Sequence, residues 1–455
     1  MAEPAASRRR WEELFRGYDI RGRYPEEIDA RTARELGRAV GRSLPGPFLM
    51  GRDARRESAW FARELERGLG SSGVHVAPLG VVPTPAIGYH ARRSKAYGLA
   101  LTPSHNAVGY VGLKGFTPSG RLFDREWLRI RDAYQGAPFD GRARTRARPS
   151  HRRESGSGRV SRRRFLESYL DHLTRGLQSD RTVVLDTRGG ATSIAAPEAL
   201  RRLGARVREL RKGFSPNFFG LSPEPRAATL GPLSGRVTRT RADLGFAFDG
   251  DGDRCVVIDD RGRTVDPEVI ALLLRDAFAP AGAPLVASLD ASRMLERHAP
   301  TTRSRVGGRY VTRAMRRTGA EVAMEPSGHY YVRRYGPDSD GILVACLVAH
   351  AVAARREPLG EFARRLGPIF RGSSVLDFPN LVARQRGYRS IVKSLGERGR
   401  AGLEGVTVDF PDGWCLVRRS NTQPSIRFAF EATGPESLRR LGEAVHQLET
   451  DSVAA

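Results

Sequence analysis

Three aspartates at alternate positions form the segment of this sequence that points most directly to chemistry. The run Phe248-Asp-Gly-Asp-Gly-Asp-Arg254 places Asp249, Asp251 and Asp253 two residues apart, with only glycines between them. An extended backbone points residues i, i+2 and i+4 to one side, so the three carboxylates are expected to converge on one hard cation. Mg²⁺ binds carboxylate oxygens and completes its octahedron with water and phosphate oxygens. The segment therefore predicts a magnesium site that serves phosphate chemistry.

Two other interpretations of the aspartate run need comparison with this one. An EF-hand loop also begins with alternating aspartates, but it requires glycine at the sixth position, where this sequence has Arg254. A solvated acidic turn between two strands remains open on this segment alone, because Gly-Asp pairs are common in turns. Short apolar runs at residues 244–248 and 255–258 predict a buried strand on each side. The other polar segments of the chain must decide between a metal loop and a turn.

A serine that follows a predicted strand is the second candidate for chemistry. The segment Ala96-Tyr-Gly-Leu-Ala-Leu-Thr-Pro-Ser-His-Asn106 runs from apolar residues into Ser104 and His105, and Lys114 follows ten residues after Ser104. A serine at the end of a buried strand can serve as a nucleophile or as a phosphate carrier. An ordinary Ser-His-Asn turn is the alternative. The Gly-x-Ser-x-Gly elbow of serine hydrolases is absent from the sequence, which argues against acyl transfer.

Two further polar segments have the groups that a phosphorylated sugar would need. The run Glu325-Pro-Ser-Gly-His-Tyr330 offers an acid, a hydroxyl and an imidazole, which can hydrogen-bond the hydroxyls of a sugar. The run Arg418-Arg-Ser-Asn-Thr-Gln-Pro-Ser-Ile-Arg427 combines guanidinium groups with small neutral donors, a combination suited to a phosphate dianion. Taken alone, the first run can equally be a loop with a structural histidine, and the second an exposed basic loop.

The elements that must position these groups alternate along most of the chain. Short apolar strands are each followed by a turn and an amphipathic helix, which predicts α/β domains with mixed or parallel sheets. The predicted strand and helix pairs are 47–50 with 60–69, 182–186 with 195–203, and 283–288 with 293–298. The C-terminal part differs, because it has three predicted strands (405–410, 414–417 and 426–431) before a helix at 435–448. This order predicts a small α+β domain at the C-terminal end.

Size and composition fit a globular protein of several domains. The chain has 455 residues, 40% of them hydrophobic, and no apolar stretch long enough to cross a membrane. Basic residues near the N-terminus are not followed by the apolar core of a secretory signal. The three cysteines, Cys255, Cys346 and Cys415, are too scattered for a disulfide framework or a zinc site. We therefore expect a cytoplasmic protein without a membrane partner.

The strong positive charge raises the possibility of nucleic-acid binding. The formal net charge is +25, but only four of the 76 basic residues are lysines, and the arginines are spread along the chain. Such a bias is more typical of coding preference than of a dedicated nucleic-acid surface. The densest stretch, residues 141–164, contains ten arginines with Ser, Gly and Pro. We expect it to be an interdomain linker; a tail for an acidic partner is the alternative. No specific nucleic-acid partner is predicted.

Taken in order, these segments resemble the signature loops of the α-D-phosphohexomutases, specifically the phosphomannomutase/phosphoglucomutase branch. The segment Phe15-Arg-Gly-Tyr-Asp-Ile-Arg-Gly22 is similar to the N-terminal motif of that family, and the resemblance extends over residues 11–450. It implies four domains around a central cleft: three similar mixed-sheet α/β domains and a small α+β C-terminal domain. The implied boundaries are 1–140 with the phosphoserine loop, 141–164 as an Arg-rich linker, 165–256 with the metal loop, 257–368 with the sugar-binding loop, and 369–455 with the phosphate-binding loop.

The resemblance also implies a role for each polar segment. Ser104 would carry the phosphoryl group and, with Asp249, Asp251 and Asp253, would hold one Mg²⁺ per chain. The catalytic and charge-stabilising residues would be Arg21, His105 and Lys114 in addition to Ser104. The substrate-binding residues would be Arg254 beside the metal, Glu325, Ser327 and His329 at the sugar hydroxyls, and Arg418, Ser420, Asn421, Thr422 and Arg427 at the phosphate.

The implied reaction is an isomerase reaction on a phosphosugar. A phosphoryl group would move reversibly between the 6- and 1-positions of a hexose through phosphoserine and a hexose 1,6-bisphosphate, which would also act as activator. The Ser-Gly-His-Tyr-Tyr run at 327–331 is similar to that of the mannose/glucose branch. Three departures leave the sugar open: Asp290 where some relatives have lysine, Gly308 where several have a polar residue, and Gln423 for a frequent glutamate. A phosphoglucosamine mutase and a non-catalytic phosphosugar- or polyanion-binding relative remain alternatives.

Overall fold

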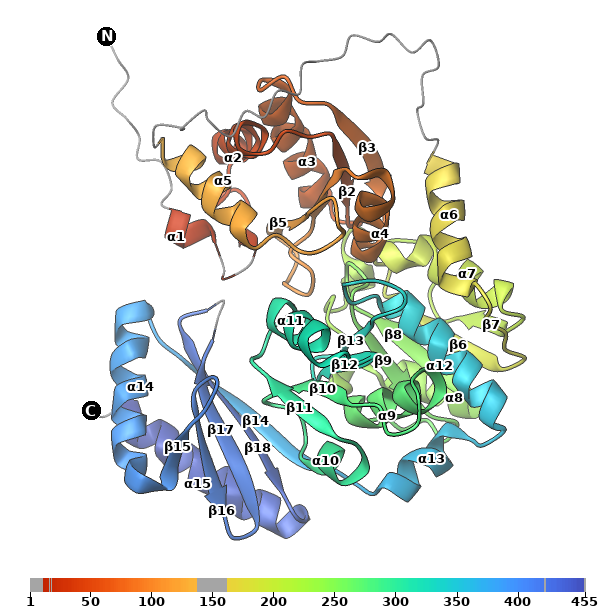
Figure 1. Ribbon diagram of the computed structural model, residues 1–455, viewed down its shortest axis with the longest axis vertical. Helices are drawn as coiled ribbons and strands as arrows, with labels where there is room; N and C mark the ends of the chain where they lie inside the picture. The colour runs from red at the N-terminus through yellow and green to blue at the C-terminus, as the bar shows by residue number, and fades with distance from the viewer. Residues whose placement is uncertain (1–10, 16, 18, 137–161, 421–422, 454–455) are drawn as a thin grey trace. The chain divides into compact units, whose positions relative to one another are not determined.

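Two compact units make up the part of the chain that the computed structural model describes, which is residues 11–453 without 16, 18, 137–161 and 421–422 (Figure 1). The first unit combines residues up to Gln178 with Leu185–Leu230 and Ala247–Asp253. The second combines Ser179–Val184, Gly231–Phe246 and the chain from Arg254 onward. The acidic run and Ser104 both belong to the first unit, whereas Arg254 opens a long segment of the second.

The first unit contains a five-stranded mixed sheet in the order β1-β5-β4-β2-β3. Its strands are β1 (Ile20–Arg23), β2 (Phe48–Arg52), β3 (Val76–Val81), β4 (Tyr97–Leu101) and β5 (Tyr110–Phe116). Strand β2 pairs in parallel with β3 and β4, while β5 runs antiparallel to β4 and β1. The loop that carries Ser104 therefore joins two neighbouring antiparallel strands, and Lys114 lies on the second of them.

Helices cover both faces of this sheet because neighbouring strand residues point to opposite sides. Met50 and Leu99 belong to the apolar cluster shared with α2 and α3, whereas Gly51 and Gly98 contact Ile87 of α4. Helices α2 and α3 pack closely, since a Cβ on Gly37 of α2 would lie 2.2 Å from a backbone oxygen of α3. The helices are α1 (Trp11–Leu14), α2 (Ala30–Ser43), α3 (Arg56–Gly70), α4 (Thr84–Ser94), α5 (Arg125–Gln135) and α6 (Arg162–Thr174).

A four-stranded sheet in the order β7-β6-β8-β9 follows in the chain. Its strands are β6 (Thr182–Asp186), β7 (Arg206–Glu209), β8 (Leu244–Phe248) and β9 (Cys255–Ile258), with helices α7 (Ala196–Arg202) and α8 (Gly231–Thr240) and the short 3₁₀ turns Ala191–Ile194, Phe218–Gly220 and Ala227–Thr229. Every residue of β8 is buried, as its apolar sequence predicts. The acidic run is the loop between β8 and β9.

The second unit contains a four-stranded sheet in the order β11-β10-β12-β13, in which only β13 is antiparallel to its neighbour. The elements are α9 (Pro267–Phe278), β10 (Leu285–Ser288), α10 (Met294–His298), β11 (Thr301–Ser304), α11 (Gly308–Thr318), β12 (Val322–Glu325), β13 (His329–Val332), α12 (Gly341–Arg355) and α13 (Leu359–Leu366). Asp340 caps α12 by accepting hydrogen bonds from two backbone N–H groups of its first turn. Glu325 and His329 face each other where β12 turns into β13.

The C-terminal sheet of the second unit is antiparallel throughout, in the order β14-β18-β17-β16-β15. Its elements are β14 (Phe370–Asp377), α14 (Leu381–Leu395), a 3₁₀ turn (Gly396–Arg398), β15 (Gly399–Ala401), β16 (Val406–Phe410), β17 (Gly413–Arg419), β18 (Ser425–Ala432) and α15 (Pro435–Val453). The cross-strand partners Val417 and Phe428 lie in one apolar core with residues of α14 and α15. Figure 1 shows both helices beside this sheet. The next pair, Arg418 and Arg427, points to the opposite face, so this sheet has one apolar and one polar side.

The predicted elements are found at their expected places, with one difference at the linker. The α/β alternation and the α+β C-terminal domain are confirmed. Residues 162–164, which we assigned to the Arg-rich linker, are instead the first residues of α6. The rest of that linker, 141–161, lies outside the described residues. No helix in the described part of the chain is long and apolar enough to span a membrane.

Candidate active site

The three aspartates of the acidic run converge, although the backbone between them is bent and not extended as we predicted. One oxygen from each of Asp249, Asp251 and Asp253 lies within 4.8 Å of the other two. Gly252 adopts a φ of +83°, and its N–H donates to Asp249 Oδ1 at 3.1 Å. This left-handed conformation favours glycine, which explains the residue type between the aspartates. The bend, and not strand alternation, brings the carboxylates together.

The donor set of this loop fits a hard divalent cation. Asp249 and Asp251 are fully buried, and Asp251 Oδ1 has no hydrogen-bond partner among the described residues. Burying a carboxylate oxygen without a partner is costly, and a cation would remove that cost. Oxygen ligands from three carboxylates suit Mg²⁺. The loop joins two strands, β8 and β9, so the EF-hand interpretation is wrong.

Ser104 lies against the acidic loop. The serine is 1% exposed, and its Oγ donates a hydrogen bond to Asp249 Oδ2 at 2.8 Å across 145 positions of sequence. His105 is partly exposed, and its Nδ1 lies 3.4 Å from the same Oγ. An ordinary surface turn would not bury its serine against a carboxylate from a distant loop. The hydroxyl is therefore placed where it can act together with a cation held by the aspartates.

Lys114 of β5 neutralises part of the acidic loop. Its Nζ donates to Asp251 Oδ2 at 2.8 Å and to Asp253 Oδ2 at 2.6 Å. Burial by itself lowers the pKa of Lys114, but the carboxylates of Asp251 and Asp253 outweigh that effect and the nearby Arg21, so the pKa is raised above its ordinary value. The side chain is thus an ammonium group, fixed between two of the three predicted metal ligands.

Arg21 of β1 also contacts the loop that carries Ser104. Its Nη1 donates to Asn106 Oδ1 at 2.7 Å and to the carbonyl of Pro103 at 3.1 Å. Its Nε and Nη2 donate to Asp19, at 2.9 and 2.7 Å. Asp19 and Asn106 were not selected from the sequence as site residues. The sequence could have indicated both, because Asp19 lies in the motif at residues 15–22 and Asn106 in the segment at residues 96–106. Together with Ser104, His105 and Lys114, Arg21 completes a cluster within the first unit.

The second unit holds the predicted sugar-binding residues at the β12–β13 turn. Glu325 is buried, and its two carboxylate oxygens accept hydrogen bonds from Tyr331 Oη at 2.7 Å and from Gly307 N at 2.8 Å. Ser327 is exposed, and its Oγ lies 2.8 Å from His329 Nδ1. A Cβ on Gly308 would lie 2.7 Å from the Tyr331 hydroxyl. The glycine found here in place of a polar residue therefore leaves room for the tyrosine that holds Glu325.

Arg254 lies beside the same turn. Its neighbour Cys255 donates its backbone N–H to the carbonyl of Gly328 at 3.1 Å, and the Arg254 Cβ is 3.8 Å from where a Cβ of Gly328 would stand. Strand β9 and the β12–β13 turn are therefore held together by the backbone. Arg254 therefore lies beside Gly328, the residue between Ser327 and His329.

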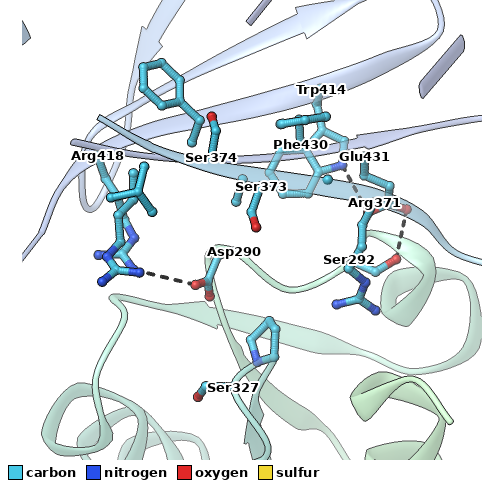
Figure 2. Close-up of a pocket in the computed structure, with 16 residues that line it drawn as sticks. Asp290, Ser292, Ser327, Arg371, Ser373, Ser374, Trp414, Arg418, Phe430 and Glu431 are labelled. Atoms are coloured by element: carbon cyan, nitrogen blue, oxygen red, sulfur yellow. Dashed lines mark hydrogen bonds and ion pairs between the residues drawn. The ribbon is translucent and has the colours of Figure 1, made fainter. Parts of the chain in front are cut away.

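A cavity of about 470 Å³ in the second unit brings together residues of both predicted binding loops (Figure 2). Arg418 and Arg427 enter it from the polar face of the C-terminal sheet, and Ser327 from the β12–β13 turn. Asp290 lies between them, with its Oδ2 3.8 Å from Arg418 Nη2 (Figure 2). The guanidinium groups and the serine hydroxyl thus share one polar cavity.

The remaining residues of the predicted phosphate loop are placed only in part. Ser420 is buried at the end of β17 and does not line the cavity; its Oγ accepts the N–H of Gln423 at 3.2 Å. Gln423 in turn accepts a hydrogen bond from Arg427 Nη2 at 3.0 Å. Asn421 and Thr422 lie outside the described residues.

Several lining residues of the cavity were missed by sequence reasoning. Glu431 accepts hydrogen bonds from Ser292 Oγ at 2.8 Å and from Trp414 Nε1 at 3.2 Å (Figure 2). Arg371 pairs with Asp266 at 3.0 Å. The available signal was the period of two in strands 370–377 and 425–432, whose polar residues share the face of Arg427. We had predicted the second of these strands for the fold alone and had not predicted the first.

The comparisons with known proteins all point to one family. Four domain families described as phosphoglucomutase/phosphomannomutase match in order: α/β/α domains I, II and III at residues 12–138, 167–262 and 267–368, and the C-terminal domain at 381–448. A phosphomannomutase/phosphoglucomutase of Pseudomonas syringae is 30% identical and covers 95% of this chain and 94% of its own. A phosphoglucosamine mutase of Nitratidesulfovibrio vulgaris is 32% identical, over 94% and 96%.

Solved structures show the same fold. A putative phosphomannomutase from Thermus thermophilus superposes with a TM-score of 0.76 at 25% identity, covering 95% of this chain and 98% of its own. A phosphoglucomutase/phosphomannomutase family protein from Burkholderia thailandensis has a TM-score of 0.79 at 23% identity, with coverages of 97% and 98%. Both the sequence matches and the fold extend over nearly the whole chain. The chain therefore belongs to the phosphoglucomutase/phosphomannomutase family of phosphohexomutases.

Proposed function

We propose that this protein is a Mg²⁺-dependent mutase that interconverts hexose 6-phosphates and hexose 1-phosphates, with mannose and glucose as its preferred sugars. The observation that carries the proposal is the 2.8 Å hydrogen bond from Ser104 Oγ to Asp249, inside a cluster of three carboxylates that fits a divalent cation. A phosphate carrier needs this combination, because phosphoryl transfer depends on placement and on neutralised oxygens more than on covalent chemistry.

The residues of the first unit would form and break the phosphoserine. When Ser104 accepts a phosphoryl group from a hexose 1,6-bisphosphate, its O–H bond would break and a bond would form between Oγ and phosphorus. The bond between phosphorus and the sugar oxygen would break, and that oxygen would take up a proton to become a hydroxyl. Asp249 Oδ2 already accepts the hydrogen bond of that proton. Lys114 and Arg21, on the neighbouring strands β5 and β1, would add fixed positive charge beside the serine loop. A cation on Asp249, Asp251 and Asp253 would neutralise phosphoryl oxygens when bound.

The residues of the second unit would hold the sugar and its non-transferred phosphate. Arg418 and Arg427 offer forked donors to a phosphate dianion in one cavity, which Ser327 also lines. From the family motif, Ser420, Asn421 and Thr422 would add neutral donors, and Glu325 and His329 would bind sugar hydroxyls. Because hexose 1,6-bisphosphate can donate a phosphoryl group to Ser104 and leave as a monophosphate, it would also act as activator.

A phosphoglucosamine mutase is the second candidate, and Asp290 is the observation that favours it. This carboxylate lines the cavity beside Ser327 and Arg418. A negative charge near the sugar would favour a substrate that carries an ammonium group over a neutral hexose. Relatives named phosphoglucosamine mutase match this chain about as well as those named phosphomannomutase/phosphoglucomutase. We rank mannose and glucose first because of the Ser-Gly-His-Tyr-Tyr run.

The proposed setting is the cytoplasm. Cys255, Cys346 and Cys415 are all buried, and Cys346 and Cys415 have free thiols, which suits a reducing compartment. The proposed partners are phosphosugars alone, without a specific nucleic acid.

A substrate panel tests the proposal. Purified protein with Mg²⁺ and a trace of glucose 1,6-bisphosphate is assayed on the 1-phosphates of mannose, glucose and glucosamine, and kcat/KM is compared. We expect turnover of all three or of the first two, with mannose or glucose highest. A tenfold preference for glucosamine 1-phosphate would overturn the sugar assignment. No turnover of any of the three, with the protein folded and Mg²⁺ present, would overturn the mutase itself.

A further inference from the structure

A fully buried arginine donates several hydrogen bonds to the loop that carries Ser104. Arg55 stands in the turn between β2 and α3 and is 0% exposed. Its Nη2 donates to the carbonyl oxygens of Ser104 at 2.9 Å and Asn106 at 2.6 Å, and its Nη1 donates to the carbonyl of Ala107 at 2.6 Å. One planar guanidinium group therefore ties down three carbonyls within four successive residues. A lysine could not reproduce this fork.

Asp53 and Thr102 connect Arg55 to the backbone N–H of Ser104. Asp53 Oδ2 accepts hydrogen bonds from Arg55 Nε at 3.0 Å and from Thr102 Oγ1 at 2.8 Å. The Thr102 hydroxyl in turn accepts the backbone N–H of Ser104 at 2.9 Å. Both the N–H and the carbonyl of Ser104 are thus fixed by one connected network, whose three members are all buried.

The network holds Ser104 in an unfavourable backbone conformation. Its φ is +55°, in the left-handed region that is unfavourable for a residue with a Cβ. Such a conformation persists only where the surrounding contacts over-determine it. With both of its peptide groups fixed, the serine directs its Oγ to Asp249, where the hydrogen bond is 2.8 Å.

The acidic loop and a buried phenylalanine enclose the arginine. The ring centre of Phe218 lies 4.8 Å from the guanidinium carbon of Arg55, and Phe218 is itself fully buried. A Cβ on Gly250 would lie 2.8 Å from the carbonyl oxygen of Ser104 and 3.2 Å from the Phe218 ring. The serine loop, the arginine and the acidic loop are therefore packed closely against one another.

We infer that Asp53, Arg55 and Thr102 are positioning residues for phosphoryl transfer: they set the direction of Ser104 Oγ relative to the three aspartates. This inference rests on the proposed function of Ser104. Arg55 is not a catalytic residue, because its guanidinium group donates to three carbonyl oxygens and to Asp53, and to no hydroxyl among the described residues. Displacing a reacting atom by about 1 Å can cost about a hundredfold in rate, so loss of the network acts on turnover and not on sugar binding.

The first test compares two substitutions at Thr102. Thr102→Val removes the hydroxyl and keeps the volume, whereas Thr102→Ser keeps the hydroxyl and removes a methyl group. We expect kcat to fall ten- to a hundredfold in T102V and to stay within threefold of wild type in T102S, with KM for the sugar phosphate changed less than threefold in both. Assays are run well below the unfolding temperature of each variant. Equal kcat values in T102V and T102S would overturn the inference.

The second test uses the arginine and matched controls. Arg55→Lys is expected to lower kcat by a similar factor, and to slow the single-turnover phosphorylation of Ser104 by glucose 1,6-bisphosphate, followed by intact mass. Thr32→Val, at a buried threonine of α2, and Arg34→Lys, at an arginine paired with Glu64, control for the same chemical changes elsewhere in the unit. If the controls lose as much kcat as T102V and R55K, the network has no special role in positioning.

The outcome can be separated from failure of the proposed function. If wild type turns over no hexose phosphate, or Ser104→Ala keeps full activity, the proposed function fails first. If wild type is active and S104A inactive while T102V and R55K keep wild-type kcat, only the positioning inference is wrong.

Discussion

At the scale of single residues, charge placement decides what each side chain can do. Lys114 is held between Asp251 and Asp253, so its charge belongs to the acidic loop. Arg418 lines the cavity with a weaker partner, since its Nη2 is 3.8 Å from Asp290 Oδ2. Lys114 offsets the repulsion among the three carboxylates of the acidic loop. The longer contact with Asp290 leaves the Arg418 guanidinium able to bind a phosphate dianion instead.

Replacing Asp290 by asparagine should improve binding of the phosphates of mannose and glucose, whose sugars carry no charge. The amide would keep the shape of the side chain and remove the charge that competes with phosphate for Arg418. We expect KM for mannose and glucose phosphates to fall two- to fivefold, with kcat changed less than twofold, measured by steady-state kinetics. Asp132→Asn, which neutralises an acid paired with an exposed arginine on α5, is the control. A rise in KM would mean that Asp290 helps to bind these sugars.

At the scale of elements, tight contacts between loops dictate residue type. Gly250 has no positive φ to explain it; it is required because Ser104 and Phe218 leave no room for a Cβ. The contact joins the loop after β4 to the loop after β8, which are far apart in sequence. In sequence each of these loops resembles an ordinary turn, but this contact fixes the position of one loop against the other.

Gly250→Ala should therefore disturb both loops. The added Cβ would lie 2.8 Å from a backbone oxygen, and overpacking of this kind costs about 1–3 kcal/mol. We expect a lower midpoint in thermal unfolding and a loss of Mn²⁺ affinity, measured by calorimetric titration. Gly231→Ala, at a glycine of α8 where an added Cβ would meet no atom within 4 Å, should leave both unchanged. Unaltered unfolding in the Gly250 variant would contradict the packing argument.

The contact between α4 and α6 should weaken in acid because of His90. Burial lowers the pKa of His90 to about 4, opposed by a hydrogen bond to the carbonyl of Phe165 and aided by the charges of Arg93 and His172. A folded pKa below the unfolded value of about 6.5 means that this stabilisation is present above pH 6.5 and is lost as the pH falls toward 4.

Hydrogen exchange of the α6 amides from pH 7 to pH 4 tests this expectation. After correction for intrinsic exchange, protection should fall across that window, by at most about 3 kcal/mol in opening free energy. His90→Gln, which keeps a donor but does not titrate, should remove that part of the pH dependence. A Gln variant with the same pH profile as wild type would assign the effect to another group.

The elements themselves were largely predictable from the sequence, and the way they create the site was not. Apolar runs such as residues 182–186 and 244–248 gave the strands, because local hydrophobicity is readable in a single chain. The convergence of the aspartates was predicted for the wrong reason, since a bend at Gly252 produces it. Arg55 was noticed only as one of many arginines, because its role depends on contacts 49 to 52 residues away.

At the scale of the whole molecule, the proposed chemistry is divided between two units. Ser104, Lys114 and the three aspartates belong to the first, and the cavity with Arg418 and Arg427 belongs to the second. The two sets share no residue, so a change in one set of groups should leave the binding properties of the other intact. The division makes metal binding and phosphosugar binding separately measurable.

A pair of substitutions should separate the two properties. Asp251→Asn is expected to weaken Mn²⁺ binding at least tenfold in calorimetric titration, because it removes a charge and a ligand. Arg418→Ala should leave Mn²⁺ affinity unchanged and raise KM for hexose phosphates ten- to a hundredfold. If R418A weakens the metal as much as D251N, the two sites are not independent.

The central claim is that Ser104 carries the phosphoryl group, and intact mass spectrometry tests it most directly. Wild type and Ser104→Ala are incubated with glucose 1,6-bisphosphate and Mg²⁺, and the bound phosphoryl groups are counted and located by peptide mapping. The control is Ser119→Ala, at a serine that shares a hydrogen bond with Thr117. We predict one phosphoryl group on Ser104 in wild type and in S119A, and none in S104A. Phosphorylation of S104A to the same extent, or turnover by a wild-type protein that never gains a phosphoryl group, would contradict the account.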